Sequence, residues 1–236
     1  MKDNTLSRLG GICSILLGVS YVVIGVTYVL LPAEQQASGD LAKFFTSFAQ
    51  NPTLSLIQYW SFALGALLAI AAVLAISQTV RAANEGWVRW TSNLAIIGFA
   101  VTAIDNFRVL AVQSARATAF VSGDAATKAA LLAPGNVAAL DPQGWLGFGA
   151  VGLWALVVSW LATKGTAWPK ISTYVGIAVG IAYWLVVAGF VLDVQVLVTI
   201  AAALGGIILA PIWYIWLGLV LRREPAPVAA PAMSHG

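Results

Sequence analysis

Residues 55–76 read SLIQYWSFALGALLAIAAVLAI, a run of 22 residues without a single Asp, Glu, Lys or Arg. An α-helix rises 1.5 Å per residue, so about 20 apolar residues are enough to cross the roughly 30 Å of hydrocarbon in a bilayer. This stretch therefore predicts a membrane-spanning helix.

Five further runs of the chain have the same character. The six predicted spans are residues 11–31, 55–76, 91–112, 145–163, 172–192 and 194–221. The whole chain is 60% apolar and only 9% charged, whereas soluble domains have about 25% charged residues. We therefore expect an all-α, polytopic membrane bundle of six transmembrane helices as one domain over residues 1–223. The Pro/Ala-rich tail, residues 224–236, is expected to be disordered.

Two positions mark irregularities in the last two spans. Asp193 is almost all that separates the fifth run from the sixth, so a tight turn is expected there. Pro211 lies inside the sixth run and is expected to kink it, because proline lacks a backbone donor and clashes with the preceding turn.

The basic residues between the runs predict the orientation. Eight lie on the side that holds both termini, namely Lys2, Arg8, Arg81, Arg89, Lys164, Lys170, Arg222 and Arg223. Three lie in the opposite loops, namely Lys43, Arg116 and Lys128, and Arg108 lies inside a predicted helix. Because cytoplasmic loops are enriched in Lys and Arg, both termini are expected in the cytoplasm, with the protein in the inner (plasma) membrane.

The two long outer loops are each predicted to contain a short interfacial helix. Asp40 can cap a helix whose Leu41, Phe44, Phe45 and Phe48 form one apolar stripe. That stripe fits equally well with a helix lying flat in the outer interface and with a helix packed against the bundle. In the second loop, Asp124 can cap a helix that extends through Leu132.

Asp105 and Arg108 are the most informative polar residues, because both fall inside the third run. Counted from Thr91, Asp105 is expected about 21 Å into the membrane. A charge at that depth is costly, so it should face the bundle interior or a wet cavity. The i, i+3 spacing places both side chains on one helix face, where they can form an ion pair.

Other polar groups are expected at a similar depth near the outer side. With Asp105 and Arg108, the candidate ligand pocket comprises Thr102, Asn106, Gln58, Tyr59, Trp60, Tyr28 and Asp193, with Gln195 and Thr199 beside them. The alternative is that Asp105 and Arg108 form a structural ion pair that only fixes helix packing.

Several kinds of chemistry are excluded by the residues that the sequence lacks. His235 is the single histidine and lies in the tail, so a bis-histidine haem, a histidine-ligated metal site and a histidine-based nucleophilic dyad are not expected. No phosphate-binding loop or dinucleotide-binding fingerprint is present. We expect no cofactor. The net charge of +3 comes from residues in the turns, so nucleic acid is not expected as a partner.

A family resemblance rests on three features. These are the opening Leu6-Ser7-Arg8-Leu9-Gly10-Gly11, the long outer loop before the fourth run, and the segment Pro211-Ile212-Trp213-Tyr214-Ile215-Trp216-Leu217-Gly218. In this layout the chain resembles an uncharacterised group of bacterial six-helix membrane proteins known only as a domain of unknown function. The resemblance implies a fold and no activity or site residues.

Three functions remain open. The first is a non-catalytic protein that binds a membrane lipid or another apolar small molecule, or that serves as an accessory subunit beside membrane partner subunits. The second is a small transporter that uses the Asp105/Arg108 site. The third is an acid/base enzyme acting on an isoprenoid or lipid with Asp105 as the acid, although catalysis is the less expected outcome because only one deep carboxylate is available. An enclosed apolar cavity would favour a binder or an enzyme, and a wet path to both faces would favour transport.

Overall fold

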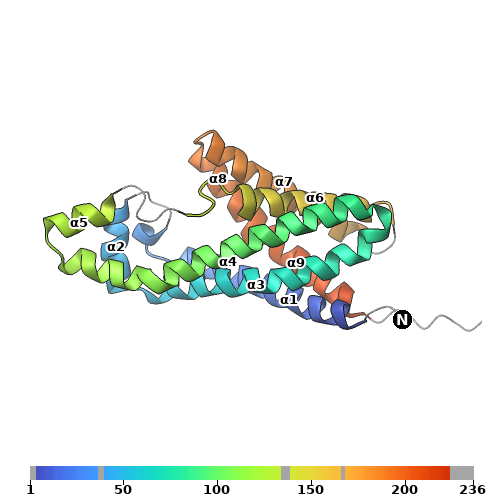
Figure 1. Cartoon of the computed structure of the whole chain (residues 1–236), viewed down its shortest axis with the longest axis horizontal. Coiled ribbons are helices and arrows are strands. Elements are labelled where there is room, and N and C mark those ends of the chain that lie inside the picture. The colour runs from blue at the N-terminus through green and yellow to red at the C-terminus, as the bar shows by residue number, and fades with distance from the viewer. Residues whose placement is uncertain (1–3, 37–39, 134–138, 166–167, 224–236) are drawn as a thin grey trace, which may run out of the picture.

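The structure is a computed structural model that describes residues 4–36, 40–133, 139–165 and 168–223. In these residues all of the regular secondary structure is helical, and six helices are long and apolar enough to cross a membrane (Figure 1). The prediction of an all-α membrane bundle with six spans is confirmed. The tail that was expected to be disordered lies outside the described residues.

Four of the spans are single α-helices. They are α1 (Asn4–Leu30), α3 (Thr53–Val80), α4 (Glu85–Ser122) and α7 (Lys170–Val191). Each of the other two contains a π-helical segment. In the fourth span η3 (Trp145–Ala150) continues as α6 (Val151–Ala162), and in the sixth α8 (Gln195–Ala202) continues through η4 (Ala203–Leu209) into α9 (Ala210–Arg222).

The short elements connect the spans. They are η1 (Ala33–Gln35), α2 (Leu41–Gln50), η2 (Arg81–Ala83) and α5 (Ala125–Leu132). We call the end of the bundle where α1 begins and α9 ends the terminal end (Figure 1). The opposite end, which holds α2 and α5, is the loop end.

The irregularity predicted at Pro211 takes the form of the π-helical segment. Pro211 lies in the first turn of α9, directly after η4. Proline cannot donate a backbone hydrogen bond, and a π-helical segment accommodates an extra residue in the turn before it. The sixth span therefore changes helix type where the sequence predicted a disturbance.

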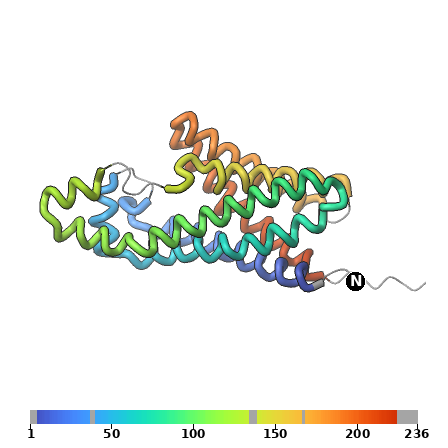
Figure 2. Tube along the Cα trace, viewed as in Figure 1, coloured from blue at the N-terminus to red at the C-terminus, as the bar shows by residue number. Residues whose placement is uncertain are grey.

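Small residues allow the first and last spans to approach closely. A Cβ on Gly11 would lie 2.9 Å from the carbonyl oxygen of Gly218, and one on Gly18 would lie 3.0 Å from that of Pro211. Figure 2 shows the resulting arrangement, in which the start of α1 (blue) lies beside the end of α9 (red). Close backbone approach of this kind is the usual basis of helix association in lipid.

A second close approach, at Gly176 and Gly180 of α7, brings α6 and α7 together. A Cβ on Gly180 would lie 2.8 Å from the carbonyl oxygen of Gly152. A Cβ on Gly176 would overlap the Ser159 hydroxyl and the Trp213 indole nitrogen. Both positions therefore require glycine for the helices to pack as they do.

Helix α4 is longer than the predicted third span. Its 38 residues correspond to about 57 Å, nearly twice the thickness of the hydrocarbon. It extends to Ser122, past the predicted limit at residue 112, because hydropathy marks where lipid contact ends and not where a helix ends. In this extension Phe120 packs against Phe45 of α2, with ring centroids 5.3 Å apart. Phe45 and Phe48 are buried, so α2 takes the second of its two expected placements and packs against the bundle.

Polar side chains fix the loop end, as the two predicted caps show. The Asp40 carboxylate accepts the Lys43 backbone N–H at 3.0 Å, and the Asp124 carboxylate accepts that of Thr127 at 2.8 Å. These backbone bonds lower the pKa of both carboxyl groups below the ordinary value.

Gln35 is a buried connection that the sequence analysis missed. Its side-chain nitrogen donates to the Ser47 hydroxyl at 3.0 Å and to the carbonyl of Asn51 at 3.1 Å. Its side-chain oxygen accepts the Ser55 hydroxyl at 2.6 Å. Gln35 thus joins η1, α2 and the first turn of α3, and it fixes where the following residues of α3 lie.

Candidate functional site

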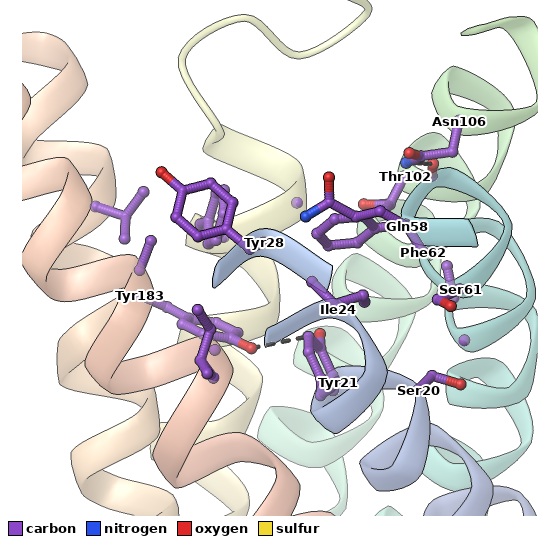
Figure 3. A pocket seen from close by; sticks show the side chains of 18 of the residues that line it. Ser20, Tyr21, Ile24, Tyr28, Gln58, Ser61, Phe62, Thr102, Asn106 and Tyr183 are labelled. Atoms are coloured by element: carbon purple, nitrogen blue, oxygen red, sulfur yellow. Dashed lines mark hydrogen bonds between the residues drawn. The ribbon is translucent and has the colours of Figure 1, made fainter. Parts of the chain in front are cut away.

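A pocket of about 490 Å³ lies between α1, α3, α4, η3, α7, α8 and η4 (Figure 3). This volume is within the range of small-molecule sites in proteins. None of the 26 described residues that line it is charged. The lining is mainly aliphatic and aromatic, with a few uncharged hydrogen-bonding groups.

Six of the hydrogen-bonding groups of the lining gather toward the loop end. They are Tyr28, Gln58, Thr102, Asn106, Gln195 and Thr199, all of which were predicted to lie together from their depth in the helices. Figure 3 shows the Gln58 amide and the Tyr28 ring in the same part of the pocket. Tyr59 also lines the pocket, and its ring packs against the aromatic cluster between α2 and α4.

Two of the three side-chain amides of the lining, those of Gln58 and Asn106, are partly buried and retain unused hydrogen-bonding capacity. The Asn106 side-chain nitrogen donates to the Thr102 carbonyl at 2.8 Å, which leaves the side-chain oxygen of Asn106 available as an acceptor. Within the described chain, no hydrogen bond engages the Gln58 amide. Donors and acceptors that are removed from water need partners, so both amides are suited to bind a polar group of a ligand.

The opposite end of the pocket is formed by tyrosines that the sequence analysis did not select. The Tyr183 hydroxyl donates to the Tyr21 hydroxyl at 3.4 Å (Figure 3). Tyr21 stacks on Tyr214 with an interplanar angle of 4° and a centroid distance of 6.0 Å. Leu17, one turn before Tyr21 on α1, also lines the pocket. Tyr28 and Leu17 are 11 residues apart on α1, so the pocket extends over about 16 Å of helix.

A sequence signal for this tyrosine cluster exists. Trp and Tyr are enriched at the membrane interfaces, whereas Tyr21 and Tyr183 lie well inside their spans. A tyrosine in the middle of a span needs a partner for its hydroxyl, and this requirement singles out both residues.

Asp105 and Arg108 lie outside the pocket, although their predicted pairing is confirmed. Arg108 Nη1 lies 3.3 Å from Asp105 Oδ1. The Asp105 carboxylate also accepts the Leu140 backbone N–H, at 3.0 Å and 3.2 Å to its two oxygens. Leu140 belongs to the segment that precedes η3, so Asp105 lies at the loop end of the fourth span.

Asp141 has a related role that the sequence analysis missed. One of its carboxylate oxygens accepts the backbone N–H groups of Leu146 at 2.8 Å and Gly147 at 2.7 Å, and thereby caps the start of η3. Gly147 and the adjacent Phe148 line the pocket. Asp105 and Asp141 therefore position one wall of the pocket without reaching its interior.

The remaining two candidates also point elsewhere. Trp60 is exposed on the outside of the bundle, where its ring meets that of Phe107 edge to face. Asp193 is exposed and has a φ of 55°, the left-handed conformation that ends a helix. The Val194 N–H reaches back to the Gly189 carbonyl at 2.8 Å. Asp193 thus makes the predicted turn between α7 and α8.

In the part of the chain that the structure describes, no three side chains of the types His, Cys, Asp and Glu lie close enough to hold a metal ion. The chemistry available in the pocket is therefore that of hydroxyls, carboxamides and aromatic faces, all uncharged at neutral pH.

A comparison with protein families finds a match over most of the chain. A family model described as "Domain of unknown function (DUF4386)" matches residues 13–220. The predicted resemblance to an uncharacterised family is confirmed by this match. No curated protein and no solved structure matches the chain.

Proposed function

The chain belongs to the DUF4386 family, and we propose that it binds one uncharged amphipathic small molecule of the membrane in the pocket between α1, α3, α4 and α7. The observation that supports this most directly is the charge-free lining of a cavity large enough for such a molecule. A charged ligand would lose its hydration there without gaining a counter-ion, which costs far more than hydrogen bonds to neutral groups return.

The two ends of the pocket define the expected ligand. The carboxamides of Gln58 and Asn106 offer donors and acceptors to a hydroxyl, carbonyl or amide group. The aromatic rings of Phe62, Phe99 and Phe148 suit an unsaturated or ring-containing apolar body. A neutral isoprenoid or a neutral lipid with one hydrogen-bonding group has this chemistry.

A binding role fits the pocket better than acid/base catalysis or ion-coupled transport. Both of the latter proposals depended on Asp105, whose carboxylate bonds to Leu140 and Arg108 instead of facing the cavity. An acid/base reaction would require a titratable group among the lining residues, and the described lining has none that titrates near neutral pH.

We further propose that the loop end faces outward from an inner (plasma) membrane, with both termini in the cytoplasm. The described loops and helix ends at the terminal end contain Arg8, Arg81, Arg89, Lys164, Lys170, Arg222 and Arg223. The loop end contains Lys43, Arg116 and Lys128. This asymmetry supports the orientation because Lys and Arg are retained on the cytoplasmic side.

Native mass spectrometry with lipidomics of the gently solubilised chain tests the binding role. We expect one neutral molecule per chain, and we expect Gln58→Leu to retain about tenfold less of it, because a lost hydrogen bond is worth roughly 1.4 kcal/mol. Gln113→Leu is the matched control, since Gln113 is a buried amide of α4 that does not line the pocket. Equal retention by the two variants would contradict the proposed polar end.

A further inference from the structure

A second hollow lies on the outside of the bundle, and Ile207 lines both this hollow and the pocket. It is a groove of about 600 Å³ between α1 and the continuous span formed by η4 and α9. Its lining is entirely apolar and consists of Val22, Ile207, Ile208, Pro211, Ile212, Ile215, Trp216 and Leu219. Val22, Ile208, Ile212 and Leu219 are exposed, so the groove opens to the surface that faces lipid.

The length of the groove matches one leaflet of a bilayer. Ile207 and Leu219 are 12 residues apart, which corresponds to about 18 Å along the helix. One leaflet contributes about 15 Å of hydrocarbon, half of the roughly 30 Å of the bilayer core. The groove extends from the middle of the sixth span toward the terminal end, so it covers the acyl-chain depth of the leaflet on that side.

Arginines lie at the terminal end of this groove. Arg222 follows Leu219 by three residues, on the same face of the helix, and Arg223 follows directly. The stem of Arg222 passes over Gly11 of α1, and Arg8 precedes Gly11 by one turn on the same face. All three arginines are exposed. The described residues of α1 and α9 contain no Asp or Glu, and the nearest acids in the sequence are Asp3 and Glu224, just beyond the described ends.

We infer that this groove binds an anionic phospholipid of the leaflet at the terminal end. The arginines bind the phosphate, because a guanidinium offers paired donors that match phosphate oxygens. One acyl chain lies along the groove between Val22 and the face of α9. This site requires a negative headgroup, whereas the pocket excludes charge, so the two sites select different molecules.

The test uses the purified full chain in detergent with added palmitoyl-oleoyl phosphatidylglycerol or phosphatidylcholine, and it counts retained lipids by native mass spectrometry. We expect phosphatidylglycerol to be retained in preference to phosphatidylcholine. Arg222→Gln should lower that preference about fivefold, the value of one basic residue near an anionic surface. Arg89→Gln, which changes an exposed arginine of α4 at the same end of the bundle, should leave the preference unchanged.

A second pair of variants tests the groove without changing charge. Ile212→Trp fills the groove and should reduce retention of phosphatidylglycerol, whereas Leu64→Trp should not, since Leu64 lies on the lipid-facing surface of α3. Both native side chains are 49% exposed. Soluble glycerol 1-phosphate should not compete, because it lacks the acyl chain.

Three outcomes would overturn the inference. These are equal retention of the two lipids, an equal effect of Arg222→Gln and Arg89→Gln, or an equal effect of the two tryptophan substitutions. Displacement by glycerol 1-phosphate would instead show a site for free phosphate. None of these outcomes affects the neutral molecule proposed for the pocket, which Gln58→Leu tests separately.

Discussion

Replacing Asp105 and Arg108 by leucine, singly and together, distinguishes a positioning role of Asp105 from a simple ion pair. Asp105 accepts the Leu140 N–H at 3.0 Å and pairs with Arg108 at 3.3 Å. A hydrogen bond to a charged group contributes about 1.5–3 kcal/mol. An ion pair in which one partner is more than half exposed, as Arg108 is at 54%, contributes about 0.2–1 kcal/mol. Asp105→Leu should therefore destabilise the protein by about 2–4 kcal/mol, and Arg108→Leu by at most about 1 kcal/mol.

The double substitution is the decisive member of the set. If the two residues depended only on each other, removing both would restore most of the stability, because neither charge would be left without its partner. The structure predicts instead that Asp105→Leu/Arg108→Leu stays within about 1 kcal/mol of Asp105→Leu, since the Leu140 N–H has lost its acceptor in both. Asp105→Asn should be milder than Asp105→Leu because the amide oxygen can still accept that N–H.

Unfolding of the four variants in mixed micelles, followed by tryptophan fluorescence, gives the free energies of unfolding. A double variant as stable as the wild type would refute the positioning role. It would show that the hydrogen bond from the Leu140 N–H to Asp105 contributes little to the free energy of unfolding. The ion pair with Arg108 would then account for the stabilising effect of Asp105. The wall formed by η3 would then need another explanation for its placement.

The remaining predictions concern packing, pH and orientation. Gly176→Ala should destabilise the bundle by about 1–3 kcal/mol through overpacking. Gly206→Ala should not, because its Cβ would meet nothing within 4 Å. Thermal unfolding compares the two variants, and equal effects would contradict the packing described. The lowered pKa of Asp40 means that its contribution to α2 is complete above the ordinary carboxyl pKa of about 3.9 and is lost as the pH falls through the lowered value. Hydrogen exchange of the α2 amides should thus be more pH-dependent in the wild type than in Asp40→Asn, and identical profiles would refute the cap. An impermeant thiol reagent should label Lys128→Cys and not Lys164→Cys in intact cells, and labelling of the latter would reverse the proposed orientation.

The spans could be predicted from the sequence because lipid contact imposes a strong compositional rule. A run such as residues 55–76 is compatible with almost no structure other than a membrane-spanning helix. The extension of α4 to Ser122 could not be predicted in this way, because beyond the membrane its length depends on tertiary contacts such as that between Phe120 and Phe45. The loop caps at Asp40 and Asp124 were predictable because they depend only on neighbours three residues away.

The candidate site was predicted in part. Tyr28, Gln58, Thr102 and Asn106 share a depth that can be counted along their helices, and all four line the pocket. Asp105 was expected beside them, but its partner Leu140 lies 35 residues away in a segment without periodicity, so no spacing rule indicates the contact.

The tyrosines at the other end of the pocket depend on the fold. Tyr21 and Tyr183 are 162 residues apart in sequence, and they meet because the fold brings α1 and α7 to the same pocket. Their pairing requires the three-dimensional arrangement of the helices.

Filling the pocket tests the central claim most directly. Gly206 lines the pocket and Gly165 lies in the connection after α6, and a Cβ on either would meet nothing within 4 Å. Gly206→Leu should therefore fold normally and occupy space that the ligand needs, while Gly165→Leu serves as the matched control. In native mass spectra with lipidomics, we predict one uncharged molecule bound to the wild type and to Gly165→Leu, and its loss from Gly206→Leu. Retention of the same molecule by Gly206→Leu, or a charged molecule that is lost only from this variant, would contradict the account.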